Sequence, residues 1–214
     1  MAGGFIVISD LQEILGDLID DIGVAYPDEI VDPYRPHPSK LLPTVRSIIV
    51  HLTSLQKTVN RYKHGSWWIN RYLHVKQVNG LIQDYLRENG FVSFAPSPYG
   101  ANPNNAVAKI SFKLAGVRAG LGSWGKNHLL IHQEFGPRVV LGVILTDAKF
   151  VRTNREIVSF CDGCTLCIEA CPLQAISLSG GFERLKCFHR NKYLSSPCRF
   201  LCMRSCPVGK AYEC

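Results

Sequence analysis

Eight cysteines lie between residues 161 and 206, and their spacing restricts what this part of the chain can fold around. The first four stand in the run Cys161-Asp-Gly-Cys164-Thr-Leu-Cys167-Ile-Glu-Ala-Cys171-Pro172. This C-x2-C-x2-C-x3-C-P spacing is typical of thiolates that bind cubane iron–sulfur clusters. The fourth cysteine of such a run ligates a different cluster, and the proline after it prevents a regular helix from continuing. The spacing therefore predicts a second cluster.

Four later cysteines can complete two clusters. They are Cys187 and the cysteines of Cys198-Arg-Phe-Leu-Cys202-Met-Arg-Ser-Cys206-Pro207. We predict that one [4Fe–4S] cluster is held by Cys161, Cys164, Cys167 and Cys206. We predict that the other is held by Cys171, Cys187, Cys198 and Cys202. The last residue, Cys214, is left over as a free thiol or as part of a ragged tail.

A single cluster, a zinc site and a disulfide framework are weaker interpretations of these cysteines. A zinc site uses four ligands with a wider central spacing. Disulfide frameworks suit short secreted chains, whereas this chain has 214 residues and starts without an apolar segment followed by a cleavage site. We therefore expect two iron–sulfur clusters in a cytoplasmic protein.

The composition agrees with a soluble protein that does not cross a membrane. Hydrophobic residues make up 46% of the chain and charged residues 19%, and no apolar run approaches the ~20 residues that a span needs. The formal net charge is +7. Ligand thiolates and cluster cores would lower it to about +3, which weakens any inference of nucleic-acid binding from charge alone.

Hydrophobic periodicity predicts three helices and four strands. The helices are expected over 9–22, 70–89 and 106–119, and the strands over 47–52, 91–95, 128–132 and 138–146. Ser9 and Gln12 form a capping box for the first helix, and Gly23 ends it. The proline-rich segments 26–43 and 96–105 are expected to be loops. The last two strands are joined by a link too short for a parallel crossover, so we expect them to pair in antiparallel fashion in an α+β sandwich.

A glycine-rich stretch follows the third predicted helix. In it, Gly120, Gly122 and Gly125 are followed directly by Lys126. Glycines allow the backbone to approach a bulky ligand closely. The spacing also matches the dinucleotide fingerprint, but that motif follows a strand and opens a helix, whereas this stretch follows a helix and precedes a strand. A tight helix-to-strand turn with a surface lysine is the simpler alternative.

Three parts of the sequence together resemble the cobalamin-dependent epoxyqueuosine reductase and reductive dehalogenase superfamily. They are Ala119-Gly-Leu-Gly-Ser-Trp-Gly-Lys-Asn127, Leu141-Gly-Val-Ile-Leu-Thr-Asp147 and the eight cysteines. The resemblance implies a nitroreductase-like α+β domain that holds a corrinoid, here residues 1–150. A bacterial-ferredoxin-like domain with two clusters would follow over residues 151–214.

The resemblance also implies a route for electrons. They would pass from an external donor of the ferredoxin or flavodoxin type through both clusters to cobalt, and the corrinoid would reduce a small organic substrate. The cluster nearest cobalt would be the one held by Cys161, Cys164, Cys167 and Cys206. The alternative is an electron-transfer protein that reduces a partner protein or its corrinoid and has no substrate of its own.

Individual residues acquire roles from the same resemblance. Lys126 would face the substrate, where an ammonium can stabilise a departing anion or donate a proton. The three glycines would shape the wall against the corrin ring. Asn127 and His128 would make polar contacts, and His128 is not expected to ligate cobalt. Tyr99 is the candidate proton donor, because the loop 95–105 lacks the acidic residue that epoxyqueuosine reductases carry there.

The chain departs from the superfamily's pattern in its last part. The final cysteines are spaced C-x3-C-x3-C-P, one residue longer than usual, so the loop around the second cluster should differ. The chain ends eight residues after Cys206, without the helical-repeat extension that grips tRNA in epoxyqueuosine reductases. We therefore expect that tRNA is not a partner. The twin-arginine export signal of reductive dehalogenases is also missing, which again predicts a cytoplasmic protein.

Two further groups of residues carry weaker signals. A basic and aromatic patch could stack on a nucleic-acid base, cover a corrin or substrate pocket, or simply pack; it consists of Arg61, Tyr62, Lys63, Trp67, Trp68 and Arg71. His51, His74 and His132 stand in apolar surroundings and are expected in the core or at its rim.

Overall fold

A four-stranded antiparallel sheet lies at the centre of the molecule, with strand order β1-β2-β6-β3. The computed structural model describes residues 7–62, 67–98 (without the side chain of Trp67), 101–152, 155–190, 193–194 and 198–209. The strands are β1 (Asp21–Ala25), β2 (Ser47–Ser54), β3 (Ser93–Phe94) and β6 (Val139–Thr146). The two longest strands, β2 and β6, pair along their whole length, from Ser47 opposite Thr146 to Ser54 opposite Val139.

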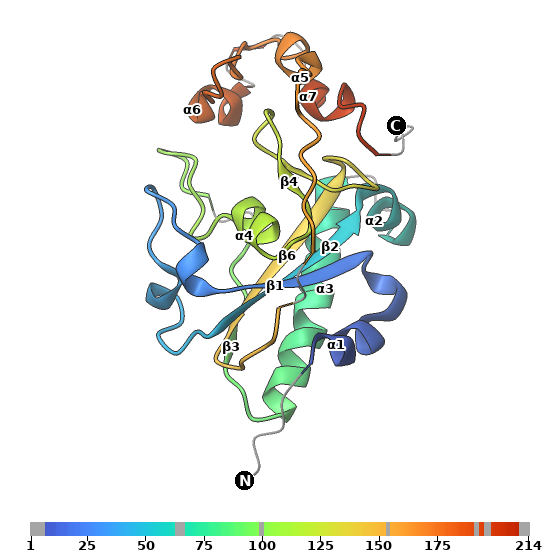
Figure 1. Ribbon diagram of the computed structural model, residues 1–214, viewed down its shortest axis with the longest axis vertical. Helices are drawn as coiled ribbons and strands as arrows, with labels where there is room; N and C mark the ends of the chain where they lie inside the picture. Colours follow the sequence, from blue (N-terminus) through green and yellow to red (C-terminus); the bar gives the residue numbers. More distant parts are fainter. Residues whose placement is uncertain are drawn as a thin grey trace.

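Helices cover both faces of this sheet (Figure 1). On one face lie α1 (Ile8–Leu15) and the long α3 (Trp67–Glu88), and on the other lies α4 (Phe112–Arg118). The helix α2 (Leu55–Tyr62) continues directly from β2 and packs against α3. The predicted sandwich of helices on an antiparallel sheet is thus confirmed, as are the strands over 47–52 and 138–146 and the helix over 70–89.

The side chains of β2 point alternately to the two faces of the sheet and so pack in two hydrophobic cores. Ile49 packs with α1 and α3, whereas Ile48, Val50 and Leu52 pack with α4. Side chains of a strand point alternately to opposite faces, so a strand that is covered on both faces reads as an unbroken apolar run. All eight residues of β2 are buried accordingly.

The first predicted helix is too long, and this prediction is wrong at its end. The helix stops at Leu15, because Gly16 turns the chain with φ +44° and opens a 3-10 turn. Ile22 lies in β1, where it pairs with His51 of β2. The helix begins after Val7 without a side-chain cap, so the predicted capping box at Ser9 is also wrong.

The predicted pairing of the last two strands is wrong as well. The short strand β5 (Leu130–Ile131) pairs with β4 (Ser123–Trp124) in a separate hairpin, and only β6 joins the main sheet.

Two other elements are shorter than predicted. The strand β3 has two residues, and α4 begins only at Phe112. Ser111 caps this helix, because its hydroxyl accepts a hydrogen bond from the backbone N–H of Leu114. The segment 26–43 is a loop, as predicted, with the 3-10 turns Pro27–Glu29 and Pro38–Lys40.

The cysteine-rich part lies at one end of the sandwich, above α4 and β4 in Figure 1. It contains the short helices α5 (Leu166–Glu169), α6 (Arg184–Phe188) and α7 (Leu201–Arg204). A connector that includes residues 155–160 leads to it, and Arg155 in this connector binds the carboxylate of Asp21 in β1 at 2.6 and 2.7 Å. The predicted boundary between two domains at residue 150 stays a prediction. Among the described residues, none of the helices combines the length and apolar character that a bilayer span needs.

Candidate metal centre

The three short helices bring the eight cysteines to one end of the molecule. Cys167 lies in α5, Cys187 in α6 and Cys202 in α7. The other five flank these helices: Cys161 and Cys164 precede α5, Cys171 follows it, Cys198 precedes α7 and Cys206 follows it. All eight are free thiols in the structure, which does not support a disulfide framework.

The first predicted quartet forms one group of interacting thiols. Burial raises the pKa of Cys167, and the charges of Cys161, Cys164 and Cys206 raise it further. Burial likewise raises the pKa of Cys206, to which the charges of Cys161 and Cys164 contribute. The contact between α5 and α7 brings together the two segments that carry these four cysteines, and their role as one set of ligands stays a prediction.

The second predicted quartet forms a neighbouring group. Burial raises the pKa of Cys202 to about 12, with added contributions from Cys187, Cys198 and Cys171. Burial also raises the pKa of Cys187, and the charges of Cys171 and Cys198 add to this rise. Cys202 also interacts with Cys167 of the first group, and α5 contacts α7, so the two groups lie side by side.

The donor chemistry of these residues bears on the choice between a cluster and a single ion. A tetrahedral zinc site needs its sulfurs about 2.3 Å from one centre. Within the described ranges, no group of three or more His, Cys, Asp or Glu residues is arranged to hold one metal ion. A cubane distributes its ligands over four irons and therefore needs a wider quartet. The hydroxyl of Ser205 is buried without a hydrogen-bond partner among the described residues, and beside Cys206 it could donate to a cluster sulfur. Eight cysteines that include the C-x2-C-x2-C-x3-C-P run, with a buried hydroxyl beside one of them, are a suitable donor set for [4Fe–4S] clusters, whose presence stays a prediction.

The glycine–lysine stretch contacts this cysteine-rich part directly. The ammonium of Lys126 donates to the carbonyl oxygen of Cys164 at 2.9 Å, and the side-chain amide of Asn127 donates to that of Cys202 at 3.3 Å. The Nε2 atom of His128 lies 3.2 Å from the carbonyl oxygen of Gly180. Each of these three predicted site residues therefore links the sandwich to a segment near the thiols.

Local packing and backbone conformation explain why glycine occupies positions 120, 122 and 125. A Cβ atom at Gly122 would lie 2.4 Å from the carbonyl oxygen of Ile131, and one at Gly125 would lie 2.7 Å from the side chain of Ile131. Gly120 has φ +78°, which favours glycine. The β4–β5 hairpin thus requires glycine at Gly122, and the turn before it favours glycine at Gly120. Their predicted contact with a corrin ring stays a prediction.

One observation in the same hairpin favours a further ligand. The hydroxyl of Ser123 is buried and lacks a hydrogen-bond partner among the described residues. Buried polar groups are normally satisfied by protein, water or a ligand. Ser123 lies next to Gly122 in the stretch whose resemblance implies a corrinoid, so a polar group of that cofactor would fit there.

Sequence reasoning missed two cations at this site. Lys113 of α4 donates to the carbonyl oxygen of His128 at 2.6 Å, and desolvation lowers its pKa to about 8. Arg138 donates to three carbonyl groups of the segment 203–208. Contacts to backbone oxygens leave no pattern in the sequence. The only signal for Arg138 is its place directly before a fully apolar strand.

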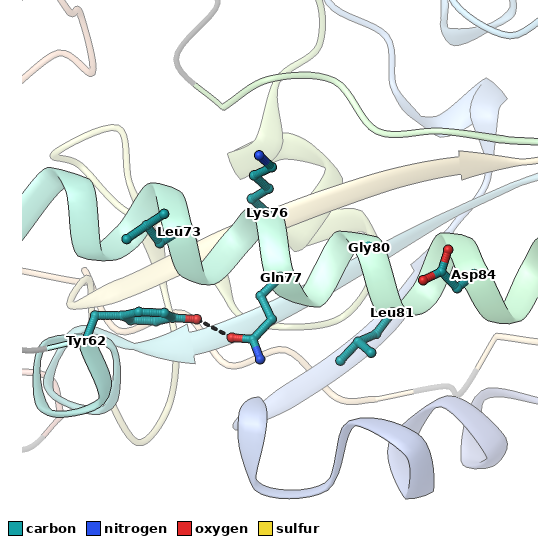
Figure 2. A pocket seen from close by; sticks show the side chains of 7 residues that line it. All are labelled: Tyr62, Leu73, Lys76, Gln77, Gly80, Leu81 and Asp84. Carbon is teal, nitrogen blue, oxygen red and sulfur yellow. Dashed lines mark hydrogen bonds between the residues drawn. The ribbon is translucent and has the colours of Figure 1, made fainter.

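Two predicted residues lie outside the described part of the chain, namely Tyr99 and Cys214. The same holds for Lys63 of the basic and aromatic patch. Figure 2 shows where another member, Tyr62, lies: its hydroxyl donates to Gln77 at the edge of an open groove along α3. The groove has a volume of about 440 Å³ and is lined by Tyr62, Leu73, Lys76, Gln77, Gly80, Leu81 and Asp84. None of these residues is a predicted cluster ligand.

Comparisons with known proteins identify relatives of this arrangement. The chain is 29% identical over 199 residues to the epoxyqueuosine reductase of Bacillus cereus, which covers 86% of this chain and 50% of the relative. It is 37% identical over 109 residues to the tetrachloroethene reductive dehalogenase of Desulfitobacterium hafniense, which covers 50% of this chain and 18% of the relative. The chain belongs to the epoxyqueuosine reductase and reductive dehalogenase superfamily. No family model matches the sequence.

The superfamily likeness extends to the fold. A crystal structure of an epoxyqueuosine reductase with a tRNA-Tyr stem loop superposes with a TM-score of 0.69 at 18% identity, over 96% of this chain and 66% of that one. Members of this superfamily are named for reductive reactions. The chain spans about half the length of the epoxyqueuosine reductase it matches, so the activity of the whole relative does not transfer without a test.

Proposed function

We propose that the protein is an iron–sulfur oxidoreductase in which two [4Fe–4S] clusters deliver electrons to a bound corrinoid that reduces an organic substrate. The observation that carries the proposal is the gathering of eight free thiols at one end of the sandwich, on α5, α6 and α7 and in the segments that flank them. Clusters held by four thiolates transfer single electrons at potentials set by their surroundings. The names of the relatives, which are all reductases, support this function over that of an electron carrier without a substrate.

The domain assignment is part of the same proposal. The sandwich of residues 1–150 would be the nitroreductase-like domain, and residues 151–214 would be the ferredoxin-like domain. The fold likeness to epoxyqueuosine reductases supports the first assignment. The position of the thiols at the end of the sandwich, next to the β4–β5 hairpin, supports a cofactor between the two parts.

The chain's own residues would hold the corrinoid, which supplies a strongly reducing cobalt centre when bound. The hydroxyl of Ser123 would satisfy a polar group of the cofactor. Lys126 would hold a proton or stabilise an anion, while its contact to the Cys164 carbonyl fixes the ammonium in place. Tyr99 would donate a proton to the substrate.

The substrate class has two candidates. We expected from the end of the chain that tRNA is not a partner, and we withdraw that expectation. An epoxyqueuosine reductase of the same fold was solved with a tRNA stem loop, and this chain spans only part of its relatives. A small organic molecule and tRNA therefore both stand as candidate substrates.

The electron donor is proposed to be an external protein of the ferredoxin or flavodoxin type. Among the described residues of the range 184–209, five are lysine or arginine and none is aspartate or glutamate. A positive surface accelerates association with a negatively charged protein and makes the rate depend on salt. The same surface would suit RNA, so the salt dependence must be measured with each partner separately.

Cobalamin binding tests the proposal. The clusters are reconstituted anaerobically, cobalamin is added, and the absorption spectrum is followed for a bound form in which cobalt has lost its lower base. We expect stoichiometric binding. A chain with both clusters intact that fails to bind cobalamin would refute the corrinoid part and favour the electron-carrier alternative.

A lysine variant tests the predicted catalytic residue. We expect Lys126→Ala to lose turnover while its iron content equals that of the wild type. Lys149→Ala is the matched control, because Lys149 is exposed in the loop after β6, and it should retain turnover. Turnover of Lys126→Ala at the wild-type rate would contradict the role, and loss of iron would reassign Lys126 to holding the Cys164 loop.

A further inference from the structure

Arg138 is a cation buried at the joint between the sandwich and the cysteine-rich part. Its side chain lies directly before β6, and only 6% of the residue is exposed. Its carbonyl oxygen accepts a hydrogen bond from the backbone N–H of Leu55 at 3.0 Å, where β2 ends. The residue is therefore fixed to the ends of the two longest strands, β2 and β6.

The guanidinium of Arg138 reaches from this anchor to the last cluster ligand. Its Nη1 atom donates to the carbonyl oxygens of Met203 at 3.3 Å and of Cys206 at 3.1 Å, and Nη2 donates to that of Val208. A guanidinium presents its N–H groups in a rigid plane, so it can hold several acceptors in one geometry. All three acceptors belong to the segment that carries Cys206.

Close backbone packing surrounds these hydrogen bonds. A Cβ atom at Gly136, whose φ is +58°, would lie 2.0 Å from the carbonyl oxygen of Val208. A Cβ atom at Gly209, whose φ is +82°, would lie 2.4 Å from the backbone nitrogen of Gly136. The side chain of Met203 packs on the small core of Leu55, Val75 and Val140. The segment 203–209 thus has little freedom to shift on the sandwich.

The charge of Arg138 also lies beside the ligand Cys206. Its Nη1 atom is 3.1 Å from the carbonyl oxygen of Cys206, and Arg138 is buried, so solvent screens this charge little. A positive charge that favours the thiolate also favours the more negative, reduced state of a cluster bound to it. It should therefore raise the reduction potential of that cluster.

We propose that Arg138 is a positioning residue that holds the Cys206 segment on the sandwich and whose charge raises the potential of one cluster, the one bound by Cys161, Cys164, Cys167 and Cys206. The proposal rests on the proposed function in that the clusters must be present. It assigns to a residue directly before β6 an effect on the reduction potential of a cluster.

Arg190 provides a matched cation for the other cluster. Its Nη1 atom donates to the carbonyl oxygen of Cys187 at 3.4 Å, which places its charge beside that ligand. Neutralising Arg190 should therefore move the potential of the second cluster. The two arginines together allow each potential to be assigned to a quartet.

The experiment compares Arg138→Gln, Arg138→Lys and Arg190→Gln with the wild type after anaerobic reconstitution. Glutamine keeps hydrogen-bond donors without charge, and lysine keeps the charge without the planar fork. A redox titration followed by electron paramagnetic resonance gives the midpoint potential of each cluster. We expect Arg138→Gln to lower one potential, Arg190→Gln to lower the other, and Arg138→Lys to stay near the wild-type values. An Arg138→Gln chain with full iron content and unchanged potentials, or with both lowered equally, would overturn the electronic role.

Hydrogen exchange tests the positioning role independently of the clusters. We expect the amides of residues 203–209 to exchange faster in both Arg138 variants than in the wild type and in Arg190→Gln. Exchange as slow as in the wild type would overturn the positioning role. If the wild type itself binds no iron, the proposed function fails, and the exchange data still decide whether Arg138 holds the segment.

Discussion

At the scale of single residues, the most unusual feature of the sandwich is a pair of buried histidines between the sheet and α3. His51 and His74 are both fully buried, as predicted from their apolar surroundings. The Nε2 atom of His51 lies 2.9 Å from the Asn79 side-chain oxygen, and that of His74 lies 2.8 Å from the Thr53 hydroxyl. Burial lowers the pKa of each to about 4, so both rings are neutral in the folded protein at neutral pH.

These histidines make stability depend on pH. An unfolded histidine has a pKa near 6.5, so between pH 6.5 and about 4 the unfolded state binds more protons than the folded state. The free energy of unfolding should therefore be highest above pH 6.5. Below pH 6.5, each of the two histidines should lower it by up to about 1.4 kcal/mol per pH unit. Urea unfolding at pH 7.5 and 5.5 measures this. His51→Gln should show a smaller loss, and a loss equal to that of the wild type would contradict the assignment.

At the scale of elements, glycines decide whether the β4–β5 hairpin can form. Gly122 has φ +154° and faces the backbone of Ile131, so alanine there forces the hairpin apart. Gly80 of α3 has no atom within 4 Å of the position a Cβ would take. We expect Gly122→Ala to destabilise the fold by about 1–3 kcal/mol. The control Gly80→Ala should stabilise it by about 0.5–1 kcal/mol, because alanine favours helix. Denaturant midpoints of the two variants that shift in the same direction would contradict this account.

A second prediction concerns the connector between the sheet and the cysteine-rich part. Burial would raise the pKa of Asp21, but hydrogen bonds from His132 and Arg155 and the charge of Arg155 outweigh it and lower the pKa. The pair with Arg155 should therefore stabilise the protein above pH 3.8 and lose its effect as the pH falls through the lowered pKa of Asp21.

At neutral pH we expect Asp21→Asn to cost about 1 kcal/mol of unfolding free energy, at the upper end of values for partly exposed pairs. The control is Asp84→Asn, whose partner Arg87 is 71% exposed in its side chain, and it should cost less than about 0.5 kcal/mol. Equal costs in chemical denaturation would show that the connector does not depend on Asp21.

The elements also show where sequence reasoning succeeds. The strand β2 and the helix α3 are long and strongly periodic, so local pattern and tertiary packing agree. The first helix was predicted too long because Leu18, Ile19 and Ile22 fit helical spacing, although the last of them is buried by pairing with β2. The partner of β5 was missed because loop length restricts strand direction and does not select the neighbour. Pairing between strands is decided by the whole fold.

At the scale of the whole molecule, the sequence predicts some features of the cysteine-rich part and misses others. Cysteine spacing predicts that the eight cysteines serve one metal centre, and the structure brings them to one end of the molecule, while their division into two quartets stays a prediction. The contacts of Lys126, Asn127 and Arg138 with carbonyl oxygens of the cysteine-rich part were not predicted. They depend on how two segments far apart in the sequence meet, and any backbone carbonyl can serve as acceptor.

The crossed ligand assignment can be tested across the molecule. Cys206 lies far along the chain from the triplet it is assigned to, so Cys206→Ser should impair the cluster of Cys161, Cys164 and Cys167. Cys171→Ser should impair the other cluster. Electron paramagnetic resonance of the reduced variants should show that each loses a different signal. Loss of the same signal in both variants would contradict the crossing.

The central claim is most directly tested by counting iron and sulfide in the anaerobically reconstituted wild-type chain, together with its Mössbauer spectrum. The account predicts about eight irons and eight sulfides per chain, as two cubanes of four each, all in the [4Fe–4S] form. About four irons, a bound zinc ion in their place, or cysteines recovered as disulfides would contradict it.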